Sequence, residues 1–301
     1  MSKKPYVPDT ERRNAASMNI DELDAAGILG VINGGDRTVA DAVGREIPYI
    51  AQAVEAAVHT IRGGGRVIYL GCGTSGRLGV LDASECPPTY NVPGDWFMGI
   101  IAGGPGALVK SSEEMEDHPE YGMADLKAVG FSAADLLIGL AASGRTPYVI
   151  GGLRYAREQG ARTVCVVCSK GSPMAGISDI AIAVDTGPEA ITGSTRMKAG
   201  TAQKMVLNMI STGTMVRLGK VYGNLMVDLR PSNDKLVERA ARIIHEITGC
   251  TEEEARRALG DAGNNVKAAA VMLSLDVDLP AAETLLAQHG GQLKKALQSA
   301  P

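Results

Sequence analysis

Residues 66–76 read RVIYLGCGTSG, an apolar run that ends in small and hydroxylic residues. The run has the length and the branched side chains of a buried strand, and the helical pattern RLGVLDASE follows it. A glycine-rich turn from a strand into a helix presents backbone N–H groups and positive potential to an anion. The stretch therefore predicts a phosphate site with Thr74, Ser75 and Gly76 as contacts. A turn that merely packs tightly is the alternative.

A second loop of the same kind follows another apolar run, residues 135–141. It reads Ala142-Ser143-Gly144-Arg145-Thr146-Pro147, in which Thr146 and Pro147 have the order of a helix N-cap and first helical residue. Two such loops in one sheet favour a ligand site over tight packing, because ligands of parallel sheets bind beyond the carboxyl ends of the strands.

Five apolar runs of strand length alternate with segments that are mostly long enough for a helix. This rhythm is typical of parallel strands buried on both faces. Helical periodicity before the first run, over residues 21–61, and after the last, over residues 196–218, adds outer helices. We expect an α/β fold, a three-layer αβα domain over residues 1–230. The predicted strands are residues 66–71, 96–102, 135–141, 162–168 and 180–184.

After residue 230 the sequence changes to short amphipathic segments with a weak internal repeat. AGNNVKAA at residues 262–269 is similar to HGGQLKKA at residues 289–296. Two copies of a helix, glycine turn and helix indicate a small helical module, residues 231–301. An accidental match between two amphipathic segments is the alternative.

Composition excludes several classes of protein. The chain of 301 residues has a net charge of −4, only 4% aromatic residues and no Lys/Arg-rich run, which argues against a nucleic-acid partner. Its longest apolar stretches are too short to span a bilayer, and MSKKPYVPDTERRN at the start lacks the apolar core of a signal peptide. An odd count of 5 cysteines at irregular spacing argues against a disulfide framework. We expect a cytoplasmic protein without a membrane or nucleic-acid partner.

The two loops resemble those of the sugar isomerase (SIS) domain, which binds phosphosugars. The CGTS-like loop corresponds to residues 72–75 and the SxSGxT loop to residues 141–146. The resemblance implies that Ser143, Gly144 and Thr146 bind phosphate and that Arg145 is available to the substrate. Ala141 stands where the family pattern often has serine, so one hydroxyl contact is missing.

Three longer stretches narrow the resemblance to the N-acetylmuramic acid 6-phosphate etherase family, over essentially the whole chain. They are LDASECPPTY at residues 81–90, GPEAITGSTRMKAGT at residues 187–201 and GNLMVD at residues 223–228. The second stretch is shared with glucokinase regulatory proteins, so a non-catalytic sugar-phosphate sensor is the alternative, and an aldose–ketose isomerase of the same fold is a third. The C-terminal module is similar to a three-helix, ubiquitin-associated-type (UBA-like) fold.

The family resemblance implies a lyase. The family removes D-lactate from C3 of N-acetylmuramic acid 6-phosphate and adds water, which leaves N-acetylglucosamine 6-phosphate in cell-wall amino-sugar recycling. Two carboxyl groups suffice for these proton transfers, without a metal or an organic cofactor. The 4 histidines are scattered and form no cluster with metal-ligand spacing. Ser194, Arg196 and Lys198 are further candidates for substrate contacts, although structural salt bridges explain the two cations equally well.

Matching the family motifs places the acid/base pair on Glu85 and Glu116. We expect Pro87 to end the helix that holds Glu85, because proline interrupts a helix. A carboxyl group at a helix C-terminus feels the negative end of the dipole, which favours the protonated acid, so we assign Glu85 as proton donor and Glu116 as base. The residues alone do not single out Glu116, since Glu113, Glu114, Asp117 and Glu120 share its stretch, and a solvated acidic helix end is the alternative.

The helix geometry predicts a homodimer with shared active sites. Glu85 lies nine residues after Gly76 on one predicted helix, which separates them by about 13 Å. A hexose phosphate held at Gly76 does not extend that far from its phosphate to C3. Either the loop at residues 143–146 anchors the phosphate, or Glu85 serves the site of a partner subunit.

Overall fold

The computed structural model describes residues 8–110, 113–229, 231 and 233–299. The chain divides into two compact units: Met1–Ser84 with Asp95–Ser211, and Glu85–Gly94 with Thr212–Pro301. The sequence predicts a domain boundary after residue 230, and residues 230 and 232 lie outside the described part. The compact units divide at residue 211 instead, inside a continuous helix, α7 (Lys198–Arg217).

The first unit contains the predicted five-stranded parallel sheet, in the order β2-β1-β3-β4-β5. Each strand begins and ends within one residue of its predicted bounds. The predicted α/β fold class, with a five-stranded parallel sheet, is confirmed. The strands are β1 (Val67–Gly71), β2 (Phe97–Ile101), β3 (Leu136–Leu140), β4 (Arg162–Val167) and β5 (Ile180–Ala183).

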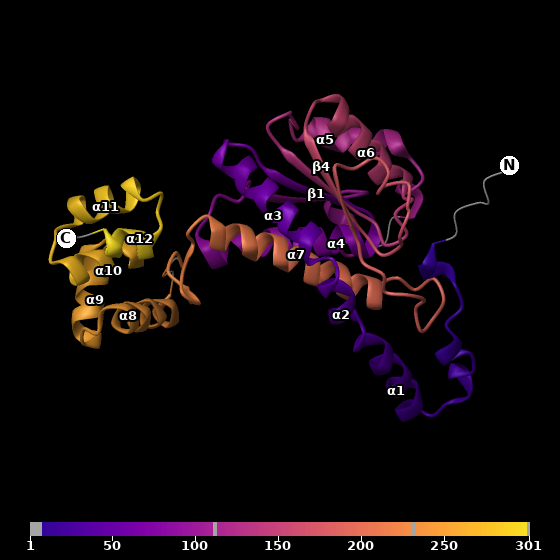
Figure 1. Ribbon diagram of the computed structural model, residues 1–301, viewed down its shortest axis with the longest axis horizontal. Coiled ribbons are helices and arrows are strands. Elements are labelled where there is room, and N and C mark those ends of the chain that lie inside the picture. The colour runs from indigo at the N-terminus through magenta and orange to yellow at the C-terminus, as the bar shows by residue number, and fades with distance from the viewer. Residues whose placement is uncertain (1–7, 111–112, 230, 232, 300–301) are drawn as a thin grey trace. The chain divides into compact units, whose positions relative to one another are not determined.

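Helices cover both faces of this sheet (Figure 1). On one face α6 packs on β1, β3 and β4, and α5 packs on α6; on the other, α3 contacts β1, β3 and β5. Coverage on both sides explains why β1 and β3 are buried at every position. The helices of this unit are α1 (Ala25–Asp36), α2 (Val39–Gly44), α3 (Ile47–Arg62), α4 (Gly73–Tyr90), α5 (Pro119–Ala128), α6 (Pro147–Glu158) and the first part of α7.

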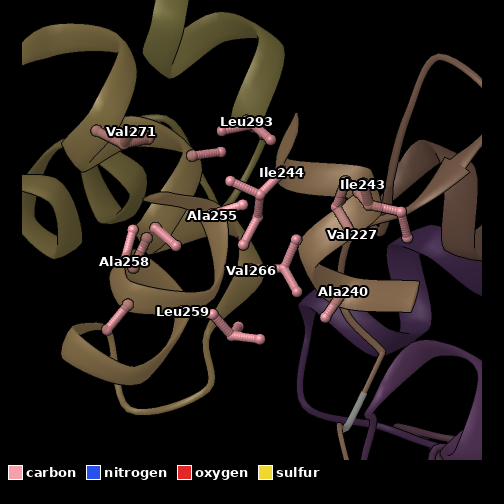
Figure 2. Close-up of a cluster of buried hydrophobic side chains, with 14 of the residues drawn as sticks. Val227, Ala240, Ile243, Ile244, Ala255, Ala258, Leu259, Val266, Val271 and Leu293 are labelled. Carbon is pink, nitrogen blue, oxygen red and sulfur yellow. The ribbon is translucent and has the colours of Figure 1, made fainter. Parts of the chain in front are cut away.

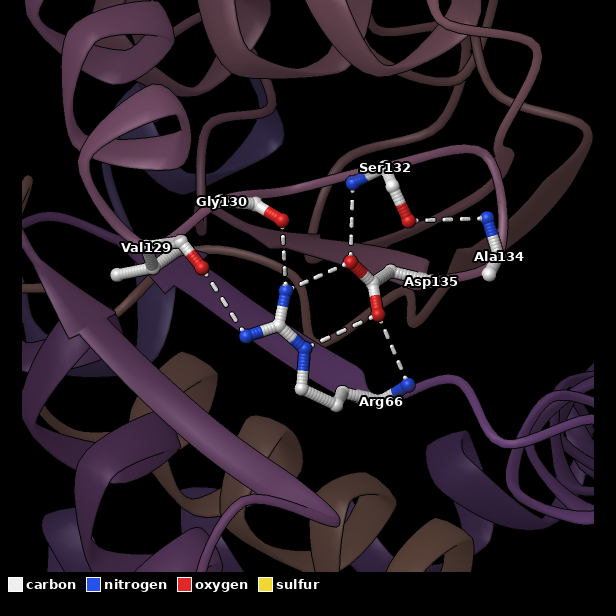
Figure 3. Close-up of polar contacts among 6 residues, drawn as sticks. All are labelled: Arg66, Val129, Gly130, Ser132, Ala134 and Asp135. Atoms are coloured by element: carbon white, nitrogen blue, oxygen red, sulfur yellow. Dashed lines mark hydrogen bonds and ion pairs between the residues drawn. The ribbon is translucent and has the colours of Figure 1, made fainter.

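An ion pair joins the starts of β1 and β3. The guanidinium of Arg66 contacts the carboxylate of Asp135 at 2.8 Å and donates further hydrogen bonds to the carbonyls of Val129 and Gly130 (Figure 3). The backbone N–H groups of Arg66 and Ser132 also donate to Asp135. Burial alone would raise the pKa of Asp135, but these donors hold it below its ordinary value. The pair therefore fixes the edge of the sheet where the strands begin.

Helix α4 continues through Pro87 and Pro88 to Tyr90, so the expectation that Pro87 ends the helix is wrong. Proline lacks a donor, but its fixed φ is helical, and a chain can continue past it when two backbone hydrogen bonds are given up. Glu85 thus lies inside the helix, and the dipole argument that assigned it the acid role does not apply.

The part of the second unit that corresponds to the predicted C-terminal module, residues 231–301, contains five helices among its described residues, whereas three were predicted. Both copies of the internal repeat form their own pair of helices. The side chains of Asn265 and Asp278 accept from N–H groups in the first turns of α10 and α11. A short antiparallel pair, β6 (Val221–Tyr222) and β7 (Leu225–Met226), precedes the helices. The helices are α8 (Asp234–Thr248), α9 (Glu252–Asp261), α10 (Val266–Leu275), α11 (Leu279–Gln288) and α12 (Leu293–Gln298).

These helices enclose a separate apolar core (Figure 2). Ile244 of α8, Ala255 of α9 and Leu293 of α12 are fully buried there. Alanine is frequent in the core, which lets short helices approach one another closely.

A buried lysine crosses this unit. The ammonium of Lys267 contacts Asp228 at 2.5 Å and donates to the carbonyls of Gly219 and Gly291. Lys220 contacts the same carboxylate at 3.3 Å. Burial lowers the pKa of Lys267, and Asp228 opposes that shift. The network ties the segment after α7 to the first residues of α10 and to the turn before α12.

Within the described residues, no helix combines the length and the apolarity needed to cross a bilayer. All five cysteines are free thiols, and Cys165 and Cys168 are fully buried.

Candidate active site

A cavity of about 800 Å³ lies in the first unit, beyond the carboxyl ends of β1 and β3. The two loops that the sequence singled out line it together. Of the predicted site residues it brings together Thr74, Ser75, Glu116, Ser143, Arg145 and Thr146.

The turn after β1 is formed by glycines in close approach. A Cβ on Gly76 would lie 2.6 Å from the carbonyl oxygen of Gly71, so no larger residue fits there. The N–H of Gly76 already donates to the carbonyl of Cys72 at 3.1 Å. Gly76 does not line the cavity and acts in packing. Helix α4 begins at Gly73, so the N–H groups of its first turn point out of the helix without a partner inside it.

The two hydroxyls of this turn differ in their surroundings. Ser75 is buried, and its Oγ donates to Oε1 of Gln203 on α7 at 2.8 Å. Thr74 is half-buried, and among the described residues its hydroxyl has no hydrogen-bond partner. Thr74 is the side chain of this turn that is available to an anion in the cavity.

The loop after β3 turns sharply at Gly144, whose φ is +65°. A Cβ there would lie 2.4 Å from the side chain of Ser172, so glycine is required by both space and conformation. Gly144 does not line the cavity, whereas Ser143 and the exposed Arg145 do. Thr146 is the N-cap of α6 and Pro147 its first residue, as predicted.

Glu116 is exposed and lines the cavity next to the first turn of α6. Its Oε1 accepts a hydrogen bond from Oγ1 of Thr146 at 2.9 Å, and its backbone carbonyl accepts from the N–H of Tyr148 at 3.0 Å. Asp117 also lines the cavity; Glu114 is exposed and does not. The side chain of Glu113 lies outside the described residues.

Glu85 does not line this cavity. Its side chain is exposed on α4, about 13 Å along the helix from Gly76. Of the two predicted catalytic carboxylates, the cavity is therefore lined by Glu116 and not by Glu85.

The predicted site residues of the GPEAITGSTRMKAGT stretch do not line the cavity. Lys198 is buried, and its ammonium donates to the carbonyl of Thr186 at 2.7 Å. Ser194 and Arg196 do not line the cavity, although their neighbours Gly193 and Thr195 do.

Several of the lining residues were not among the predicted site residues. Arg77, one residue beyond the glycine turn, lines the cavity, and its guanidinium donates to the carbonyls of Ala107 and Leu108. Glu11 comes from the N-terminal segment, for which no pattern gave a signal. Cys72 lines the cavity too, and burial, followed by the nearby Glu116, raises the pKa of its thiol. The thiol is therefore neutral at physiological pH and is no nucleophile.

The sheet and its two loops define a SIS domain. The SIS family model matches residues 114–212, that of the glucokinase regulatory protein N-terminal SIS domain matches residues 49–157, and that of the C-terminal lid domain of glucokinase regulatory protein matches residues 223–278. The chain is 55% identical over 288 residues to the N-acetylmuramic acid 6-phosphate etherase of Pectobacterium atrosepticum, across 96% of this chain and 95% of that one. It is 54% identical to that of Cronobacter sakazakii, across 96% and 97% of the two chains. The chain belongs to the N-acetylmuramic acid 6-phosphate etherase family.

Proposed function

We propose that this protein cleaves the D-lactyl ether of N-acetylmuramic acid 6-phosphate and adds water, releasing D-lactate and N-acetylglucosamine 6-phosphate. The observation that carries the proposal is identity above 50% along 96% of the chain to etherases of this name. The cavity supports it, because a helix N-terminus and a carboxylate line one hollow of a size suited to a sugar phosphate.

The chemistry is a pair of proton transfers. In the open-chain sugar the C2 proton lies α to the aldehyde, so a carboxylate can remove it as the C3–O bond breaks. We assign this step to Glu116, which lines the cavity. The departing lactyl oxygen takes a proton from Glu85, a role that rests on the family motif and not on a helix C-terminus. Water then adds at C3, Glu85 accepts its proton, and Glu116 returns the proton to C2.

The phosphate anchors the substrate at the start of α4. The unpaired N–H groups of the first helical turn and the hydroxyl of Thr74 face the cavity, with Ser143 and Arg145 on the opposite loop. A dianion is favoured at this end of a helix. Arg77 lies on the same wall and adds positive charge.

The deciding experiment is release of D-lactate from N-acetylmuramic acid 6-phosphate. The wild-type protein should release it, and Glu116→Gln and Glu85→Gln should each lower kcat by at least about 100-fold, the range for loss of a general acid or base. Glu114→Gln is the matched control, because this neighbouring carboxylate does not line the cavity. Binding without turnover by the wild-type protein would instead make it a sugar-phosphate sensor, and C1–C2 interconversion without lactate would make it an isomerase.

We further infer a homodimer in which Glu85 serves the partner's cavity. The support is the exposed position of Glu85 outside its own cavity and the apolar helix α1, of whose residues none is buried. Leu29 on that helix is 65% exposed. The free cysteines agree with a reducing, cytoplasmic location, the setting for amino-sugar recycling.

A further inference from the structure

The N-terminal segment reaches the active-site cavity through a short 3-10 turn, Asp9–Glu11. Two backbone groups of this turn are bonded to the loops that follow β4 and β5. The N–H of Asp9 donates to Oγ of Ser169 at 3.1 Å. The carbonyl of Thr10, a residue that is fully buried, accepts from the N–H of Gly193 at 3.3 Å. The turn is therefore a fixed part of the cavity wall.

The loop that receives this turn is itself held in place. The side chain of Asn14 donates to the carbonyl of Pro188 at 3.2 Å. The carboxylate of Glu189 is fully buried and accepts from the N–H groups of Lys198 and Ala199 at 3.0 and 2.9 Å. These N–H groups belong to the first turn of α7, where a negative charge is favoured. The loop after β5 thus connects the N-terminal segment to α7.

Glu11 brings a carboxylate into the cavity from this wall. It lines the same cavity as Thr74 and Arg145. A Cβ built on Gly193 would lie 3.4 Å from Oε2 of Glu11, so the carboxylate lies against the loop after β5. Among the described residues, the carboxylate accepts no hydrogen bond and forms no ion pair. Both of its oxygens are therefore available to a ligand.

A carboxylate accepts hydrogen bonds and repels anions. The proposed substrate carries two anionic groups, the phosphate and the lactyl carboxylate, and neutral donors, which are its hydroxyls and its amide N–H. Arg77 and Arg145 line the cavity and suit the anionic groups. Glu11 suits only the neutral donors.

We propose that Glu11 is a substrate-binding residue that accepts a hydrogen bond from a neutral donor of the amino sugar, either a hydroxyl or the amide N–H. The assignment rests on the etherase activity proposed above. It gives the N-terminal segment a part in recognising the sugar and leaves the phosphate to the loops after β1 and β3. Loss of a hydrogen bond to a charged acceptor should lower the affinity by about 10- to 100-fold.

Calorimetry with two ligands tests the assignment. Glu11→Ala should bind N-acetylglucosamine 6-phosphate at least about 10-fold more weakly than the wild type does. It should bind inorganic phosphate as tightly as the wild type or more tightly, because a negative charge has left the cavity. Glu22→Ala is the matched control: it removes an exposed carboxylate of the N-terminal segment that does not line the cavity. Both of its affinities should stay within about 2-fold of the wild type.

A sugar analogue distinguishes the two kinds of donor. 2-Deoxyglucose 6-phosphate keeps hydroxyls but lacks the acetamido group. If the amide N–H is the donor, Glu11→Ala and the wild type should bind this analogue equally. If a hydroxyl is the donor, the loss of about 10-fold or more should persist.

The kinetics of lactate release give an independent readout. Glu11→Ala should raise KM by at least about 10-fold with kcat within about 3-fold, because the bond is made equally in the ground state and the transition state. A wild-type protein that binds the sugar phosphate but releases no lactate refutes the etherase, and the calorimetry still decides the role of Glu11.

Three results would overturn the inference. Unchanged affinity for the sugar phosphate would show that Glu11 makes no contact with it. An equal loss of affinity for both ligands would mean that Glu11 only shapes the wall, and tighter binding of both would make it only a repelling charge. The thermal unfolding midpoint checks the folding of each variant. If Glu11→Ala does not fold, Glu11→Gln keeps the size of the side chain, removes its charge and carries the same comparison of the two ligands.

Discussion

Tyr69 donates a hydrogen bond from its phenolic oxygen to Oδ2 of Asp82 at 2.9 Å, inside a layer that shields both side chains from solvent. The other carboxylate oxygen accepts from Asn208 and Ser211 on α7. One aspartate thus connects β1, α4 and α7. Burial raises the pKa of Asp82, and the three donors oppose the shift.

We predict that Tyr69→Phe destabilises the first unit by about 2 kcal/mol, because it removes a donor from a buried carboxylate. The single tryptophan, Trp96, lies in this unit, so its fluorescence during urea unfolding reports the change. Tyr121→Phe is the control, since Tyr121 is 41% exposed. If Tyr121→Phe lowers the free energy of unfolding as much as Tyr69→Phe does, the buried network contributes no more than an exposed tyrosine.

The pH dependence of this group has a definite sign. A carboxyl with a raised pKa keeps its proton longer in the folded than in the unfolded protein. Its contribution to the free energy of unfolding is therefore largest at acid pH and falls as the pH rises above about 4, until the folded group has ionised. Tyr69→Phe should extend that fall to higher pH, because loss of the phenolic donor raises the folded pKa of Asp82 further.

Asp135→Asn should lower the free energy of unfolding by about 3 kcal/mol at pH 7, because Arg66 loses its buried counter-charge. Here the pKa of the carboxyl is lowered in the folded protein. Its stabilisation is present above the unfolded pKa, about 3.9, and is lost as the pH falls through the folded value. Unfolding followed by Trp96 fluorescence should show that the difference in free energy of unfolding between wild type and variant shrinks at acid pH. The exposed control Asp36→Asn should show no such difference at either pH.

Lys267→Met should destabilise the second unit by about 3 kcal/mol, since it leaves the Asp228 carboxylate and two carbonyls without their buried donor. Circular dichroism at 222 nm during urea unfolding measures the loss of these helices. Lys294→Met, an exposed lysine of α12, is the matched control. Equal unfolding curves for the two variants would show that the buried ammonium contributes nothing.

The sequence predicted what depends on local pattern and missed what depends on contacts far apart in the chain. The five strands were found because each is a short apolar run, and the N-cap at Thr146 because Pro147 follows it. The bond between Thr146 and Glu116 joins residues 30 positions apart, so no local pattern contains it. Nor does any local rule show that α4 continues past Pro87, because that depends on the packing around the helix.

The proposed homodimer can be tested by mixing two inactive variants. In a twofold dimer whose cavity takes Glu116 from one subunit and Glu85 from the other, a Glu85→Gln chain paired with a Glu116→Gln chain has one intact site. Each variant alone should be inactive. Co-refolded in equal amounts, half of the dimers should be mixed with one good site each, so lactate release should recover to about a quarter of the wild-type rate.

The control is a mixture of Glu85→Gln with a second preparation of Glu85→Gln, which has no intact site in any pairing. Leu29→Lys, on the apolar helix α1, should lower the fraction of dimer in sedimentation and abolish the recovery. Val109→Lys should do neither, since Val109 is 93% exposed on a loop outside that helix. Mixed dimers that form but stay inactive would show that both glutamates of a site come from one subunit. The substrate would then have to span the distance of about 13 Å along α4 between Gly76 and Glu85.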